Sequence, residues 1–189
     1  LGERDPESGE LTSLSMERVL DTLQRFKELA VSYEVEQLLV AATSAVREAP
    51  NGQLFLNRIK EELEIDVGLL SGAEEARLIY LGVLSGMDFG DSPHFLVDIG
   101  GGSTELILAD RGEARALTST RVGAVRLQRD FVKQDPMSSK RRSFLQTFIQ
   151  GSLEPAVEKV SSRLNPGEAP VMVATSGTAL AIGALASSE

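Results

Sequence analysis

Three consecutive glycines between two apolar segments constrain this chain more than any other feature of its sequence. Residues 95–99 (FLVDI) precede the glycines and residues 105–109 (ELILA) follow them, and both segments are typical of strands. Glycine permits positive φ angles and close approach of the backbone, so successive N–H groups can turn toward an anion. Two hydroxyl side chains follow directly and add donors. The sequence therefore predicts a phosphate loop made of Gly100, Gly101, Gly102, Ser103 and Thr104.

The residues around the glycines exclude two common nucleotide-binding loops. No lysine follows the glycines, so the segment is not a Walker loop. The spacing also differs from the dinucleotide fingerprint, and a strand rather than a helix follows. A tight glycine hairpin without a ligand is the structural alternative.

Two carboxylates flank the predicted loop. Asp98 ends the first strand and Glu105 begins the second, so both side chains can lie at the mouth of the loop. Mg²⁺ takes one or two protein carboxylates and completes its shell with water and phosphate oxygens. The sequence therefore predicts a Mg²⁺ site at Asp98 and Glu105. The alternatives are a turn residue for Asp98 and an ion-paired or surface residue for Glu105.

A third acidic candidate begins a helix that follows a strand. The segment 71–78 (SGAEEARL) places Glu74 and Glu75 in the first helical turn, where negative charge is favourable, and this suffices for Glu74. Open α/β sheets bind ligands at the carboxyl ends of their strands, where this junction falls. We therefore expect Glu75 to face the phosphate loop and to activate a water molecule.

Two weaker candidates complete the predicted site. Arg47 follows an Ala-Thr-Ser junction and can bind phosphate, with a solvated or ion-paired side chain as the alternative. A turn of small residues can form a second anion cradle, with an ordinary helix N-cap as the alternative. This turn consists of Ser176, Gly177 and Thr178. The basic residues 140–142 are expected on a solvated helix face, with guidance of a polyanion as the alternative.

The pattern of apolar residues predicts an α/β fold in two lobes. In residues 1–92 helices and strands alternate, with expected strands at 37–43, buried on both faces, and at 65–70. Residues 93–189 open with an antiparallel meander that carries the glycine loop. A helical region at 138–164, broken near Gly151 and Pro155, a strand at 171–175 and a helix from Thr178 follow.

Composition narrows the chemistry further. The net charge of −9 disfavours nucleic acid and anionic membranes as partners. The chain has no cysteine and a single histidine, His94, which excludes disulfides, thiolate zinc sites and paired-histidine metal sites. No apolar run approaches the roughly 20 residues that span a bilayer, and the N-terminal segment is polar. We expect a soluble, cytoplasmic protein with oxygen-ligand chemistry.

Five segments together resemble one enzyme family, that of the exopolyphosphatases and guanosine pentaphosphate phosphohydrolases. The segments are ATSAVREA (42–49), SGAEEARLIYLGV (71–83), LVDIGGGSTELIL (96–108), VGAVRL (122–127) and ATSGTALAIG (174–183). DIGGGSTE alone is shared with the wider sugar-kinase and actin-like superfold, whereas the combination is far more specific. The resemblance covers most of the chain in order.

The resemblance implies a fold and a set of roles. The fold would be two related actin-like (ribonuclease H-like) lobes with a phosphate cleft between them. Glu75 would activate water, Asp98 would serve magnesium and catalysis, Glu105 would be an acidic partner, and Arg47 would line the cleft. The family's opening DxGSNS loop has no counterpart before Leu1, and the chain stops soon after ATSGT. We therefore expect a truncated piece in which both lobes are incomplete.

The implied activity is metal-assisted release of terminal phosphate from inorganic polyphosphate or guanosine pentaphosphate. Two alternatives stay open: an actin-like ATP-dependent kinase or ATPase, and a module that binds polyphosphate or nucleotide without turnover. The choice between the two substrates also stays open, as do activity of this piece alone and a homodimer of the full-length protein.

Overall fold

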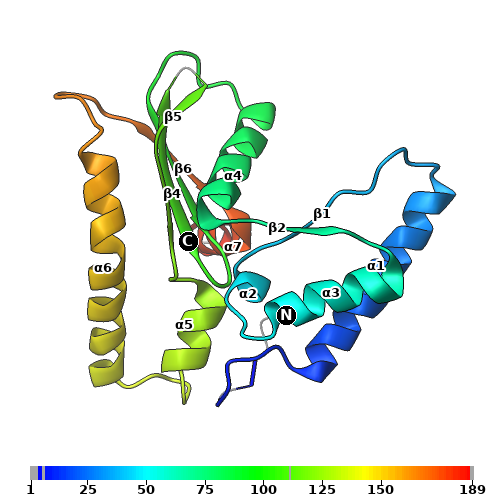
Figure 1. Cartoon of the computed structure of the whole chain (residues 1–189). Helices are drawn as coiled ribbons and strands as arrows, with labels where there is room; N and C mark the ends of the chain where they lie inside the picture. The colour runs from blue at the N-terminus through cyan, green and yellow to red at the C-terminus, as the bar shows by residue number, and fades with distance from the viewer. Residues whose placement is uncertain (1–3, 6, 111, 188–189) are drawn as a thin grey trace. The chain divides into compact units, whose positions relative to one another are not determined.

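The computed structural model describes residues 4–5, 7–110 and 112–187, which form two compact units (Figure 1). Unit 1 is Leu1–Ser71 and unit 2 is Gly72–Glu189. The units therefore divide after Ser71, whereas the two lobes predicted from sequence divide after residue 92. The reason is that helix α4 (Gly72–Gly86) packs against the strands of unit 2.

Unit 1 has three helices and two short parallel strands in its described part. Its elements are α1 (Ser13–Ser32), β1 (Val40–Ala42), α2 (Ser44–Arg47), α3 (Gly52–Leu63) and β2 (Val67–Leu69). The strands pair with Val40 opposite Val67. Phe55 and Ile59 of α3 form the centre of the core, where the partly buried Val40 also packs.

The expectation that residues 37–43 form a strand buried on both faces is wrong in extent and in burial. Only three residues pair, and the preceding Leu39 is 81% exposed. Val40 and Ala42 pack on the helical core, whereas Ala41 is exposed on the other face. A continuous apolar run therefore did not distinguish a strand covered on one face from one covered on both.

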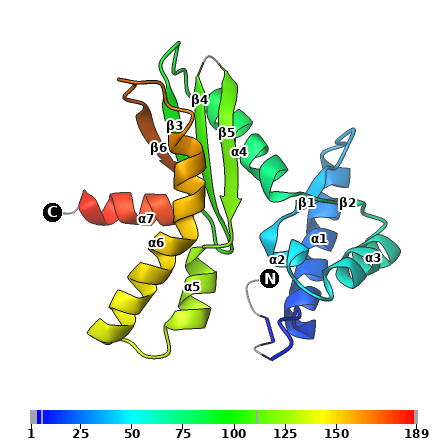
Figure 2. The same cartoon turned by 60° about the vertical axis from the view of Figure 1, so that its left-hand side comes forward.

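Unit 2 contains the predicted meander and one added parallel strand (Figure 2). After α4 its elements are β3 (His94–Ile99), β4 (Thr104–Asp110), β5 (Glu113–Thr120), α5 (Ala124–Phe131), α6 (Ser139–Ser161), β6 (Val171–Thr175) and α7 (Ser176–Ala186). The strand order is β5-β4-β3-β6, in which β6 is parallel to β3. The sheet confirms the expected α/β class.

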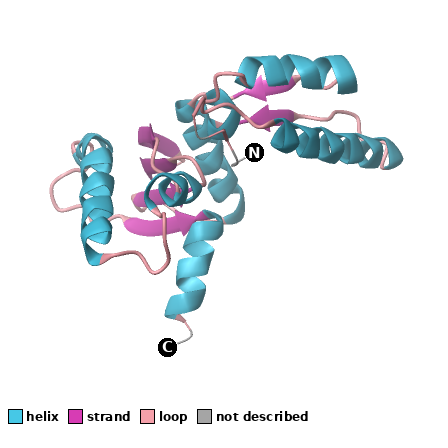
Figure 3. Cartoon of the chain, turned by 90° about the horizontal axis from the view of Figure 1, so that it is seen from below, coloured by secondary structure: helices cyan, strands magenta, loops and turns pink. Residues whose placement is uncertain are grey.

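The sheet of unit 2 lies between α4 and α6 (Figures 2 and 3). Along β4, Leu106 and Leu108 pack with Ala156 and Val160 of α6. The intervening Ile107 and Ala109 pack instead with Ala76 and Tyr80 of α4. This alternation is the period of two of a strand that is covered on both faces, and it fixes which side chains share a face.

Two helix boundaries differ from the expected ones. Helix α6 is continuous through Pro155, so the expected break near Gly151 is wrong. Proline removes one main-chain hydrogen bond, and burial of Ala156 and Val160 against the sheet maintains the helix. Helix α7 begins at Ser176 and not at Thr178. In the described part of the chain, no helix has the length and apolar character needed to cross a membrane.

Candidate functional site

Three carboxylates gather on the α4 face of the sheet in unit 2. Leu96 and Ile107 face α4, so the alternation also places Asp98 of β3 and Glu105 of β4 on this face. Asp98 and Glu105 are direct cross-strand partners. Glu75 in the first turn of α4 lies near enough for its negative charge to raise the pKa of Glu105. The structure thus brings together the three acidic residues predicted from sequence.

Glu105 is buried, with only 1% of its surface exposed. Burial raises the pKa of its carboxyl group, and the neighbouring Glu75 and Asp98 charges raise this pKa further. Hydrogen bonds from Ser119 and Ser103 oppose that shift. The Ser119 hydroxyl lies 2.6 Å from Glu105 Oε1, because Ser119 is the cross-strand partner of Glu105 on β5. A surface or ion-paired Glu105 is therefore excluded.

The raised pKa of Glu105 predicts a pH-dependent stability. A folded-state pKa above the unfolded value gives stability that is present below about pH 4.5 and lost as the pH rises through the folded pKa. We therefore expect Glu105→Gln, which retains an acceptor for Ser119, to exceed the wild type in free energy of unfolding at pH 8, with a smaller difference at pH 5.

Chemical denaturation at both pH values measures this difference. Glu113→Gln, at an exposed position of β5, is the matched control and should show no such trend. A Glu105→Gln variant whose advantage is equal at pH 5 and pH 8 would contradict the effect of burial on this group.

Asp98 is oriented by a residue far along the chain. Because β3 and β6 are parallel with Asp98 opposite Thr175, the Thr175 hydroxyl donates to Asp98 Oδ2 at 2.6 Å. The next residue, Ser176, donates from its hydroxyl to the main-chain oxygen of Ile99 at 2.7 Å. Ser176 has φ of 76°, a left-handed conformation that a residue with a side chain rarely adopts. The predicted second turn therefore lies beside the strand that leads into the glycine loop.

The main-chain oxygens of the glycine loop are held from one side. Ala124 N donates to Gly100 O at 2.9 Å, and Arg126 N donates to Gly101 O at 3.0 Å. Arg126 Nε donates to Gly102 O at 3.1 Å. These donors come from the start of α5, which the sequence did not predict as a helix.

This arrangement determines where the loop amides point. In a trans peptide the C=O of one residue and the N–H of the next point in opposite directions. Oxygens turned toward α5 therefore turn the following three amides away from it. These amides belong to Gly101, Gly102 and Ser103, and within the described residues none of them donates to a protein atom. Successive N–H groups with one orientation can bind an anion.

Gly100 and Gly101 are explained by close packing against neighbouring atoms and not by positive φ angles. Neither Gly100 nor Gly101 has φ in the left-handed region, so that part of the sequence argument is wrong. A Cβ on Gly101 would lie 3.3 Å from Val125 Cγ2. The contact is closer at Gly123, where a Cβ would lie 2.5 Å from the main-chain carbon and oxygen of Gly101. Helix α5 can hold the loop only because Gly123 has no side chain.

The remaining candidates occupy separate positions. Glu74 lies in the first turn of α4, as expected, and also forms an ion pair with Arg77 at 2.8 Å. Arg47 belongs to unit 1 and donates to Leu70 O at 2.6 Å, at the end of β2. The hydroxyl of Thr104 donates to Val122 O and so links the end of the glycine loop to the segment before α5.

Four residues of the site were missed from sequence. Thr175 and Ser119 become neighbours of the acidic residues only through strand register. Gly123 and Arg126 lie in VGAVRL, and the family resemblance of that segment was the available signal.

The carboxylates beside the loop are candidate ligands of a divalent cation. Among the described residues, no group of three or more histidine, aspartate or glutamate side chains could hold a metal ion by itself. Asp98 Oδ1 lies 3.9 Å from the Cβ position of Gly100, which places a carboxylate oxygen beside the loop. One or two carboxylates combined with phosphate oxygens are the usual ligands of Mg²⁺. The residues present fit such a cation.

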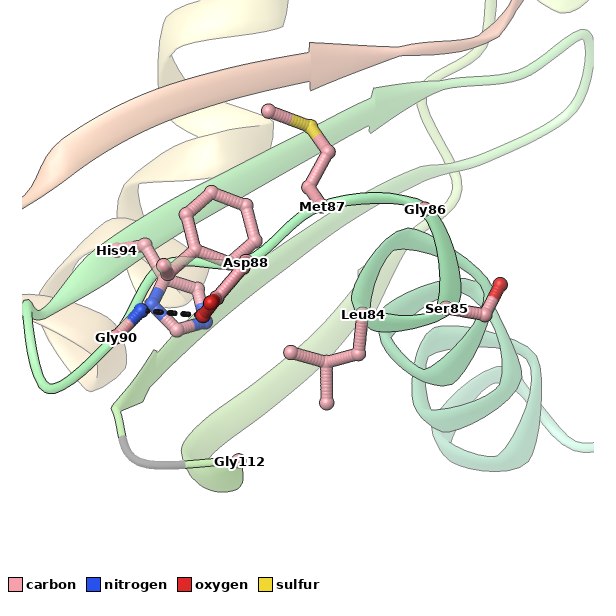
Figure 4. A pocket seen from close by; sticks show the side chains of 9 residues that line it. Leu84, Ser85, Gly86, Met87, Asp88, Gly90, His94 and Gly112 are labelled. Atoms are coloured by element: carbon pink, nitrogen blue, oxygen red, sulfur yellow. Dashed lines mark hydrogen bonds between the residues drawn. The ribbon is translucent and has the colours of Figure 1, made fainter.

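A separate cavity of about 500 Å³ lies at the amino-terminal end of β3 (Figure 4). It is lined by residues 84–90 with His94 and Gly112. The His94 ring stacks on Phe89, with centroids 4.2 Å apart, and His94 Nδ1 lies 3.0 Å from Ser92 O. The glycine loop follows the carboxyl-terminal end of β3, so this cavity is distinct from it.

The sheet places the chain among α/β proteins, and the outward-turned amides of its glycine loop have an orientation that can bind an anion. Residues 1–187 match the model of the Ppx/GppA phosphatase family. The chain belongs to this family. This finding confirms the family that the sequence motifs indicated.

Individual relatives agree with the family. Exopolyphosphatase 1 of Mycobacterium tuberculosis is 32% identical over 179 residues, which are 94% of this chain and 51% of that protein. Guanosine-5'-triphosphate,3'-diphosphate pyrophosphatase of Photobacterium profundum is 33% identical over 150 residues, 79% of this chain and 30% of the relative. An exopolyphosphatase structure from Cytophaga hutchinsonii has a TM-score of 0.84 at 32% identity and covers 94% of this chain and 55% of its own. The chain thus spans about half the length of the curated exopolyphosphatases it matches.

Proposed function

We propose that this chain carries the phosphate-binding loop and the acidic residues of a phosphohydrolase. The enzyme would release terminal phosphate from inorganic polyphosphate or guanosine pentaphosphate, the substrates that the relatives' names indicate. One observation carries the proposal: three main-chain amides turn outward beside a sheet face with three carboxylates. The amides suit a phosphate group, and the carboxylates suit activation of water. The further expectation of two actin-like lobes with a cleft between them belongs to this proposal.

The proposed reaction is displacement at the terminal phosphorus atom. A water oxygen attacks phosphorus, the bond from phosphorus to the bridging oxygen breaks, and the shortened phosphate chain leaves. Glu75 accepts the proton of the attacking water. The amides of Gly101, Gly102 and Ser103 donate to the phosphoryl oxygens on which negative charge is concentrated. The three nearby carboxylates would repel the negatively charged phosphate of the substrate. A cation is therefore expected to accompany the substrate.

A divalent cation such as Mg²⁺ would be held by Asp98, with Glu105 adding negative charge nearby. When bound, the cation would neutralise phosphate charge. Thr175 already engages Asp98 Oδ2, which leaves Oδ1 at the loop for a ligand. Glu105 accepts hydrogen bonds from two serine hydroxyls and is buried, so it fits a supporting position better than a direct ligand.

Binding to the loop tests the proposal directly. Tripolyphosphate with Mg²⁺ is titrated into the ¹⁵N-labelled chain, and the amide resonances of Gly101, Gly102 and Ser103 are expected to shift most. Residues Ala156 and Val160 of α6 serve as the internal control, because they pack on the opposite face of the same sheet. Absence of any shift at the three loop amides would refute the anion-binding assignment.

Turnover distinguishes the proposed enzyme from its alternatives. Phosphate release from polyphosphate and from guanosine pentaphosphate is measured with the chain and with the longest natural protein that contains it. Metal-dependent release without ATP supports the hydrolase. Phosphoryl transfer that requires ATP would support the kinase alternative, and binding without release by the longer protein would support the binding module.

A further inference from the structure

The side chain of Arg126 holds one peptide of the phosphate loop. Two hydrogen bonds join Arg126 to the loop: its main-chain N donates to Gly101 O at 3.0 Å, and its Nε donates to Gly102 O at 3.1 Å. The first bond depends only on the backbone of α5, whereas the second depends on the arginine. We propose that Arg126 is a positioning residue that fixes the Gly102–Ser103 peptide and so aims the Ser103 amide at a bound phosphate.

A glycine peptide needs such a restraint. Gly102 has no Cβ, and its backbone therefore has access to more conformations than that of any other residue. If the Gly102–Ser103 peptide turned over, its oxygen would face the phosphate and its amide would face α5. A carbonyl oxygen beside a phosphate is repulsive, so this one rotation would remove a donor and add an unfavourable contact. The bond from Arg126 Nε opposes the rotation.

The geometry also separates positioning from direct binding. Arg126 Nε contacts Gly102 O, and the Ser103 amide points the opposite way from that oxygen. The guanidinium group therefore contacts the loop from the side of α5, behind the amides. Its donors have a fixed planar geometry that a lysine ammonium group does not reproduce. Lysine at this position retains the charge and loses the directed Nε–H bond.

This inference rests on the proposed function, and its test compares tripolyphosphate affinities by calorimetry with Mg²⁺ present. We expect Arg126→Met and Arg126→Lys each to weaken binding about fivefold to tenfold, the loss of one hydrogen bond of ordinary strength. The slope of affinity against salt concentration should stay unchanged. Arg129→Met, one turn along α5 at a residue paired with Asp130, is the matched control and should bind as the wild type does.

Two outcomes would overturn the inference. Wild-type affinity in Arg126→Met would show that the bond is dispensable. Recovery of affinity in Arg126→Lys, together with a shallower salt dependence in Arg126→Met, would show direct charge contact with the ligand.

A ligand-free measurement keeps the inference separate from the proposed function. Relaxation dispersion of the Gly102 and Ser103 amides should reveal added microsecond-to-millisecond exchange in Arg126→Met and none in Arg129→Met. If the wild type does not bind tripolyphosphate, the proposed function fails, while this exchange still decides whether Arg126 restrains the peptide. Equal exchange in the wild type and Arg126→Met would refute the restraint.

Discussion

Gly123→Ala is expected to disrupt the phosphate loop and to lower the free energy of unfolding by about 3 kcal/mol. The added Cβ would lie 2.5 Å from main-chain atoms of Gly101 and Gly102, a distance at which the backbone must move. The φ of Gly123 is −138°, which alanine adopts readily, so the effect would be steric and not conformational. Tripolyphosphate binding should be lost together with the stability.

Chemical denaturation and calorimetry measure these two effects. Gly151→Ala is the matched control, because Gly151 lies within α6 with no atom near its Cβ position. That substitution should stabilise the chain by about 1 kcal/mol through helix propensity. A Gly123→Ala variant with unchanged stability and affinity would show that α5 does not hold the loop by close contact.

Glu75→Gln is expected to lower the rate of phosphate release by about 100-fold to 10,000-fold, the usual contribution of a general base. The amide occupies nearly the same space but cannot accept the proton of the attacking water. Substrate affinity should change little, because the loop amides are untouched. Single-turnover phosphate release, measured with the longest natural protein that contains this chain, separates the chemical step from binding.

The neighbouring glutamate provides the control for this experiment. Glu74→Gln removes a carboxylate that already pairs with Arg77, and it should alter the rate by less than threefold. If Glu75→Gln retained the wild-type rate, another group would have to accept the proton.

Much of the glycine-loop region could be predicted from local sequence. The segment from Phe95 to Ala109 has apolar strands on both sides of the glycines, and the structure places β3 and β4 there in direct antiparallel register. Asp98 and Glu105 became cross-strand partners because the loop is short. The local sequence pattern was sufficient to predict this part of the site because the residues that contact one another are close in the sequence.

The remaining parts of the site depend on contacts that local pattern does not encode. Thr175 meets Asp98 only through the parallel register of β6 with β3. The sequence likewise gave no sign that Glu105 is buried, because burial comes from the α4 face of the sheet and from Ser119. Position 123 requires glycine because a Cβ there would clash with the main chain of the loop, and this contact exists only when α5 packs against the loop.

The hydrogen bond from Thr175 to Asp98 means that the site can be completed only late in the synthesis of the chain. The hydroxyl of Thr175 orients the carboxylate of Asp98, which lies 77 positions earlier in the chain. A nascent chain that has been synthesised only as far as the meander therefore contains the glycine loop but lacks the residue that orients Asp98. The geometry is completed when the last strand docks beside the first. A truncation before residue 171 would therefore leave Asp98 without the hydroxyl group that orients its carboxylate.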